Sequence, residues 1–139
     1  MAITTAMCNS FKTEVLGGTH DLDTHTLKIA LIKSGTYGAG TVNYSTVTGN
    51  SDEASGTNYS AGGQNLDSAA ISLSGSTAIV DFADEVFSTV TVSAAGCIIY
   101  NSSASNKAIC VIDFGGTVSS VAGNLTIQFP AADASNAII

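Results

Sequence analysis

The chain contains no arginine and no tryptophan, and it carries few charges of either sign. Its 139 residues include four basic residues, all of them lysine, and eleven acidic residues, so the formal net charge is −7. Binding to nucleic acid needs a basic surface that neutralises phosphates, and binding to an anionic membrane surface has the same requirement. The composition therefore disfavours both kinds of partner.

Cysteine, proline and long apolar runs are also scarce. Cys8, Cys97 and Cys110 form no C-x-x-C pair, so zinc and redox motifs are unsupported. We expect Cys97 and Cys110, which lie in apolar strand-like runs, to be small buried hydrophobic residues. A disulfide between them would need Cα atoms within about 7 Å, which the sequence leaves open. No run approaches the roughly 18 apolar residues of a membrane span, and residues 1–10 lack the charged region and apolar stretch of a signal peptide, so we expect synthesis in a cytosol.

The residues that are present favour strands. Ile, Val, Leu and Phe recur in short runs that are separated by Ser, Thr, Asn and Gly, as in short strands joined by many turns. One helix is predicted over residues 4–16, capped by Thr4 or Thr5 and ended by Gly17 and Gly18. Its apolar stripe comprises Ala6, Met7, Phe11, Val15 and Leu16.

The first strand is predicted over residues 26–33, with Leu27, Ile29 and Leu31 on one face and the face of Lys28 partly wet. Residues 34–63 are the least regular part, and a loop this long is uncommon unless it contacts a partner. The tyrosines Tyr37, Tyr44 and Tyr59 are spread through it. Tyrosine suits an interface, but these rings could equally pin the loop to its own sheet.

Residues 64–139 form the β-rich body of what we expect to be a single domain covering residues 1–139. Strands are predicted at 64–66, 69–73, 78–82, 89–92, 96–100, 108–114 and 125–129, with turns at 74–76, 83–85, 93–95, 101–106 and 115–116. Pro130 is expected to end the last strand. No second pattern of helical length appears. The predicted fold is mainly β: an antiparallel, jelly-roll-like sandwich or barrel with one short N-terminal helix.

Residues suited to catalysis or metal binding are few. His20, Asp21, Asp23 and His25 are metal-ligand types, but Asp and Thr in a short connection also serve as turn residues, which is the favoured interpretation. The chain has no G-x-S-x-G motif. Asp81, Asp84, Glu85 and Asp113 could supply paired carboxylates, yet strand alternation would turn Asp81 and Asp113 away from the phenylalanines that follow them. We therefore predict a non-enzyme without a cofactor or metal.

Several motifs, taken in order along most of the chain, resemble a family of small structural proteins of tailed phages. The resemblance begins with the N-x-F-K and G-x-H-D elements within residues 9–31. It continues at residues 56–63 (GTNYSAGG), at residues 78–82 followed by Asp84, at residues 111–116 (VIDFGG) and at residues 125–130. One departure is Phe87, which stands in the region where family members often carry tryptophan.

The resemblance implies a virion protein that decorates or cements the outer surface of the phage head. It implies the major capsid protein as partner, a homo-oligomer of closed symmetry such as a trimer, and synthesis in the cytoplasm of a bacterial host. Phe11, Tyr37, Tyr44 and Tyr59 are the candidate partner-binding residues, and the helix or the loop 34–63 would make the capsid contact. The alternative is a tail, neck or fibre component that binds a receptor or carbohydrate through the tyrosines.

Overall fold

The fold was obtained as a computed structural model, which describes residues 2–67 and 69–129. Strands hold 50% of the residues and helices 13%, and all strand pairs within the sheets are antiparallel, so the fold is mainly β as predicted. No helix in these two ranges is long and apolar enough to cross a membrane. The end of the predicted β-rich body, from Pro130 to residue 139, lies outside the described residues.

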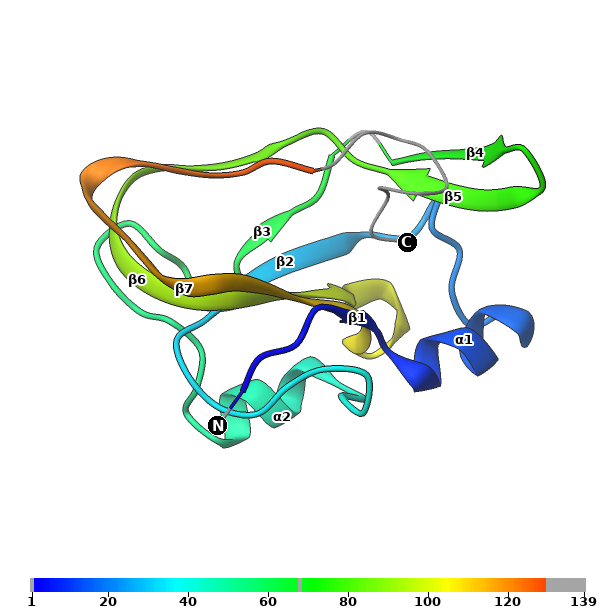
Figure 1. The fold of residues 1–139 in the computed structure, drawn as a ribbon, viewed down its shortest axis with the longest axis horizontal. Helices are drawn as coiled ribbons and strands as arrows, with labels where there is room; N and C mark the ends of the chain where they lie inside the picture. The colour runs from blue at the N-terminus through cyan, green and yellow to red at the C-terminus, as the bar shows by residue number, and fades with distance from the viewer. Residues whose placement is uncertain (1, 68, 130–139) are drawn as a thin grey trace.

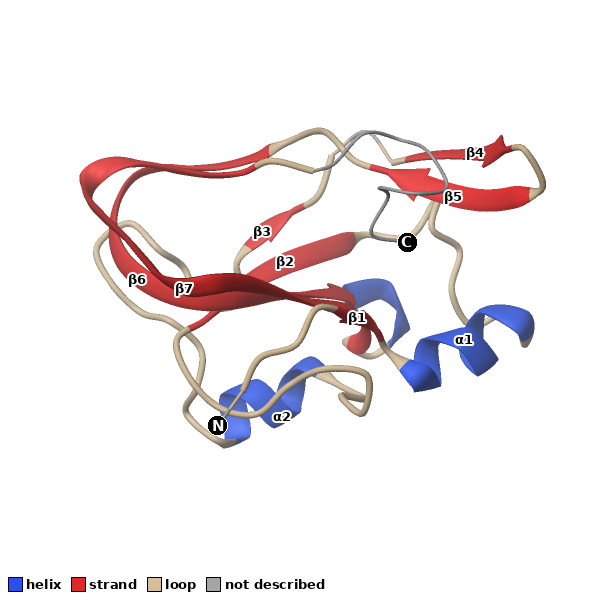
Figure 2. Ribbon diagram, viewed as in Figure 1, coloured by secondary structure: helices blue, strands red, loops and turns tan. Residues whose placement is uncertain are grey.

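A five-stranded sheet and a separate hairpin make up the β structure. The sheet has the order β1 (Ala6–Met7), β7 (Lys107–Ile127), β6 (Glu85–Asn101), β2 (Leu27–Ile32) and β3 (Gln64–Asn65). The hairpin pairs β4 (Ala70–Ser74) with β5 (Thr77–Asp81). Figure 2 shows this hairpin standing apart from the larger sheet.

The long ribbon of β6 and β7 bends back over itself and supplies both layers of the sandwich (Figure 1). The predictions had four short strands here, with turns at 93–95 and 115–116, and those turns are wrong. Register shifts in the β6–β7 pairing, one of them between Ala94 and Gly96, mark bulges that kink a strand without ending it. Gly115 and Gly116 adopt positive φ within β7, so the chain bends there and continues.

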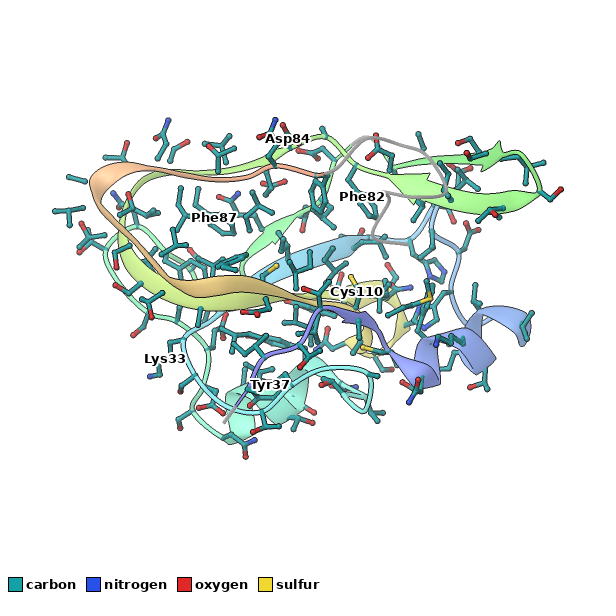
Figure 3. All side chains as sticks on the ribbon, in the orientation of Figure 1. Lys33, Tyr37, Phe82, Asp84, Phe87 and Cys110 are labelled. Carbon is teal, nitrogen blue, oxygen red and sulfur yellow. The ribbon has the colours of Figure 1, made fainter. Side chains whose placement is uncertain are left out.

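The core fills the space between the two halves of the ribbon. Phe87, Val90 and Leu125 come from one half, and Ile98 and Ile109 come from the other; all five are buried. Figure 3 shows Phe87 and Phe82 pointing into this space. The apolar positions of a strand-rich sequence therefore meet without a helix between the layers.

Strand β2 confirms the prediction for residues 26–33, but the expected wet face is nearly absent. Ala30 and Ile32 are as fully buried as Ile29 and Leu31, and only Lys28 is partly exposed. The upper half of the bent ribbon lies above this strand, and the first part of the loop 34–63 lies below it (Figure 1). Both faces are thus covered.

The N-terminal helix α1 (Asn9–Leu16) is shorter than the predicted 4–16. Residues Ala6 and Met7 form β1 instead, pairing with β7. The predicted threonine caps and most of the apolar stripe are wrong: the N-cap is Cys8 without a side-chain bond, and of the helix only Phe11 is buried. Gly18, at φ 81°, ends the helix in the left-handed conformation as expected.

A second helix, α2 (Tyr44–Gly49), lies inside the loop that was predicted to be irregular. Asn43 caps it by accepting a hydrogen bond from the Ser45 backbone N–H. Six residues are too few for a periodic pattern to be recognised, so sequence periodicity does not predict this helix. A short 3-10 helix, η1 (Ser102–Ala104), forms the predicted turn between β6 and β7.

Candidate interaction surface

Tyr37 fastens the start of the loop 34–63. Its side chain is 4% exposed, and its hydroxyl donates to Asp52 Oδ2 at 2.7 Å and accepts from Asn50 Nδ2 at 3.2 Å. Ser34 Oγ donates to the other oxygen of Asp52. These hydrogen bonds hold the pKa of Asp52 below its usual value.

Glu53 is the hub of the loop. Its Oε1 accepts hydrogen bonds from the Tyr59 hydroxyl at 2.9 Å and from the Gly62 N–H at 2.7 Å, and its Oε2 accepts from the Tyr44 hydroxyl. The Tyr59 hydroxyl also accepts from the Leu31 N–H at 2.9 Å, which ties the loop to β2. Burial first, and then the neighbouring Glu53, raise the pKa of Tyr44; for Tyr59 burial is again the main cause.

The candidate tyrosines are therefore engaged inside the molecule. Tyr44 stacks on Tyr100 of β6, whose hydroxyl donates to the Gly62 carbonyl at 2.6 Å. This geometry supports the interpretation in which the rings pin the loop to its own sheet. Sequence reasoning missed Glu53 as their shared acceptor; the one available signal was the acidic pair Asp52 and Glu53 in an otherwise uncharged, tyrosine-rich stretch.

Phe11 and the two histidines also face inward. Phe11 is 3% exposed, and its ring lies 5.0 Å from the ring of His20. Asn101 Oδ1 accepts a hydrogen bond from the Ser103 N–H. This bond orients the side-chain amide so that Nδ2 points toward the two histidines. Nδ2 then donates to His20 Nδ1 at 3.0 Å and to His25 Nδ1 at 2.9 Å.

That arrangement defines the chemistry of the residues weighed as metal ligands. Since His20 Nδ1 accepts a hydrogen bond, its proton lies on Nε2, which donates to Glu14 Oε1 at 3.1 Å. Asp21 accepts from the backbone N–H groups of Asp23 and Thr24, and hydrogen bonds from Thr24 and Asp23 lower its pKa. Within residues 2–67 and 69–129 no group of three His, Cys, Asp or Glu side chains is placed to hold a metal ion.

The carboxylates weighed as a catalytic pair lie on different sheets, Asp81 on β5 and Asp113 on β7. Asp113 accepts from the Gly115 N–H, and Asp84 accepts from the Phe129 N–H. Glu85 is buried and accepts from Gln64 Nε2; burial raises its pKa. Each of Asp84, Glu85 and Asp113 thus accepts a hydrogen bond that fixes local structure.

All three cysteines are free and buried, which confirms the predicted burial of Cys97 and Cys110. In the β6–β7 pairing Cys97 lies opposite Ile112, and Cys110 lies opposite Ile99, so the two are not directly paired across the strands. Burial raises the pKa of each thiol, for Cys8 to about 11 with a contribution from Glu14. These thiols are consequently poor nucleophiles.

One end of the molecule carries an apolar surface instead. Four of the eight exposed large hydrophobic residues in the described ranges gather there: Val15 and Leu16 at the end of α1, and Ile71 and Leu73 on β4. Leu16 is 89% exposed and Leu73 is 72% exposed. A groove of about 590 Å³ separates α1 from the hairpin, and it is lined by Met7, Phe11, Val15, Gly18, His20, Asp21, Leu22, Ile71, Ala78, Ile79 and Val80. The sequence places Leu16 on the apolar stripe of the predicted helix and predicts a strand at 69–73, but neither was among the candidate partner-binding residues.

Comparisons with models of protein families, with curated proteins and with solved structures give no match for this chain.

Proposed function

We propose that this protein is a non-enzymatic virion protein that decorates the outer surface of a tailed-phage head and stabilises it. The motifs spread over residues 9–130 support this, because they resemble small structural proteins of tailed phages in both content and order. The proposal includes the major capsid protein as partner, a homo-oligomeric state and a place on the capsid surface.

The observation that carries the proposal is the way polar and apolar groups are distributed. Polar side chains form hydrogen bonds that hold loops and turns in place, as Asp52, Glu53, Asn101 and His20 do. Four of the eight exposed large hydrophobic side chains in the described ranges gather at one end, around α1 and β4. A protein whose work is to add contact area needs that distribution, since clustered exposed apolar side chains mark interaction sites.

We assign the capsid contact to the end of α1, around Val15 and Leu16. The other candidate, the loop 34–63, is held against the sheet by its tyrosines, whereas Leu16 is almost fully exposed. A specific interface buries roughly 1,200–2,000 Å² in total, and an array of many copies multiplies a modest contact into a stable coat.

Purified particles of the phage that encodes the chain test the proposal. We expect the protein at a fixed ratio to the major capsid protein by quantitative mass spectrometry, and antibody labelling over the whole head by electron microscopy. The purified Leu16→Lys variant should bind heads stripped of the protein less tightly than the wild type. Val121→Lys, which changes an equally exposed residue of β7, is the matched control and should bind as the wild type does.

Absence from intact particles, or labelling confined to the tail, would contradict capsid decoration. Labelling at the tail tip would favour the alternative of a receptor- or carbohydrate-binding module. We do not pursue that alternative, because Tyr37, Tyr44 and Tyr59 have their hydroxyls bound to Asp52 or Glu53 and are not free to act together as a sugar-stacking platform.

A further inference from the structure

We infer that two copies of this chain associate through β4, which pairs antiparallel with the β4 of the second copy about a two-fold axis at Ser72. The resulting sheet would have the order β5–β4–β4–β5 across the two copies. This inference specifies the homo-oligomeric state named in the proposed function, but it concerns the purified protein alone and does not depend on a place in the virion.

The first ground is the isolation of the hairpin. Among the described residues, β4 and β5 pair only with each other, and no ladder joins them to the five-stranded sheet. A two-stranded hairpin is marginally stable in water unless further strands or a packed face support it. Four of the five residues of β4 are exposed, whereas Ile79 and Val80 of β5 are buried. Within the described ranges, β4 is therefore the more exposed strand of the hairpin.

The second ground is the direction of the backbone groups of β4. Ser74 pairs with Thr77 across a two-residue loop, so hydrogen-bonded pairs recur at Ser72 with Ile79 and at Ala70 with Asp81. The N–H and C=O groups of Ile71 and Leu73 then point away from β5. A two-fold axis at Ser72 sets Ile71 opposite Leu73 of the second copy, where each pair can exchange both backbone hydrogen bonds.

The third ground is side-chain chemistry. Edge strands are commonly protected by a charge, a proline or a bulge, and β4 has none of these. Its side chains Ile71 and Leu73 are 55% and 72% exposed, and the pairing would bring them together as apolar cross-strand neighbours. A two-fold interface needs a patch that is complementary to itself, and this pairing provides it.

Charge selects a second copy over a charged partner. The chain carries a net charge of −7, so copies of it repel one another over most of the surface. Between Asp67 and Asp81 the sequence has no charged residue. Strand β4 is therefore a stretch at which two acidic copies can meet without bringing like charges together, and it offers no charge to attract a basic or acidic partner.

Disulfide trapping tests the register directly. In the proposed dimer the two Ser72 residues form a non-hydrogen-bonded pair, whose Cα atoms lie roughly 4.5 Å apart, within the range that a disulfide spans. The three native cysteines are buried and do not interfere. Under mild oxidation, Ser72→Cys should form a cross-linked dimer much faster than Ser88→Cys, an exposed serine of β6 that serves as the control.

Sedimentation of the full-length protein supplies the second measurement. The wild type should shift from monomer to dimer as its concentration rises, and Leu73→Lys should remain a monomer with an unchanged circular dichroism spectrum. The control Val121→Lys should associate as the wild type does. A wild type that stays monomeric or forms trimers, a Leu73→Lys variant that still dimerises, or equal cross-linking at positions 72 and 88 would each overturn the inference.

Discussion

The ring of Tyr44 lies parallel to the ring of Tyr100, with centroids 4.3 Å apart and 7° between the planes. Tyr44 is the first residue of α2 and Tyr100 belongs to β6, so this contact fastens the loop helix to the main sheet. Tyr44→Phe keeps the stacking but removes the hydroxyl that donates a hydrogen bond to Glu53. We expect this change to lower the free energy of unfolding by about 1 kcal/mol. Tyr44→Leu loses both and should cost about 1 kcal/mol more. Urea unfolding measures both; equal losses would show that the stacking contributes nothing.

Glu53→Gln should destabilise the protein more than any single tyrosine-to-phenylalanine change in the loop. The glutamate accepts from the Tyr44 and Tyr59 hydroxyls and from the Gly62 N–H. A glutamine places an NH2 group against one of these donors, and we expect a loss of about 1–3 kcal/mol. Asp23→Asn, at an exposed acidic residue, is the control and should be nearly neutral. A Glu53→Gln variant as stable as the Asp23→Asn control would show that the hydrogen bonds to Glu53 do not stabilise the loop.

Alkaline pH should unfold the protein as its tyrosines ionise. Burial raises the pKa of all four tyrosines, that of Tyr100 to about 12. The folded state therefore retains protons that the unfolded state loses near pH 10, and stability falls with rising pH. The contribution is complete below pH 10 and is lost as pH rises through the folded values. Phenolate absorbance and circular dichroism should change together. Phenolate formation near pH 10 with an intact spectrum would contradict this.

Two glycines with nearly the same φ should respond differently to alanine. Gly63 and Gly115 have φ of 75° and 77°, so alanine is strained at both, at about 1–2 kcal/mol. A Cβ on Gly63 would lie 1.7 Å from the Ile29 carbonyl oxygen, whereas nothing lies within 4 Å of one on Gly115. Gly63→Ala should therefore cost several times as much in unfolding free energy, or prevent folding. Equal effects would mean that the loop does not approach β2 as closely as described.

The native thiols should resist modification. Cys8, Cys97 and Cys110 are buried, and burial raises the pKa of each, so little thiolate exists near pH 8. A thiol-specific aromatic disulfide reagent should react with none of them in the folded protein and with all three after unfolding in urea. Rapid labelling of the folded protein would show that part of the core opens readily.

The sequence was sufficient where structure depends on near neighbours. The alternation from Leu27 to Ile32 specified a strand, and Ser74 and Gly75 specified a tight turn, because side-chain period and turn chemistry are local properties. The burial of Cys97 and Cys110 also followed from their apolar surroundings, whereas only the structure showed that they are free. The interaction surface was harder to predict from the sequence. Leu16 and Leu73 have the pattern of apolar residues in a helix and a strand, and nothing in the neighbouring sequence indicates that they are exposed.

By itself, then, the sequence determined a mainly β chain with one N-terminal helix, few reactive groups and an acidic charge. Only the tertiary structure decided that residues Ala6 and Met7 join β7, that β6 and β7 each run through a glycine-containing bend, and that Glu53 gathers the tyrosines. The physical reason is distance along the chain. A glycine permits a turn, a bulge or a bend alike, and a polar side chain has several partners within reach; the choice depends on contacts between residues far apart in sequence.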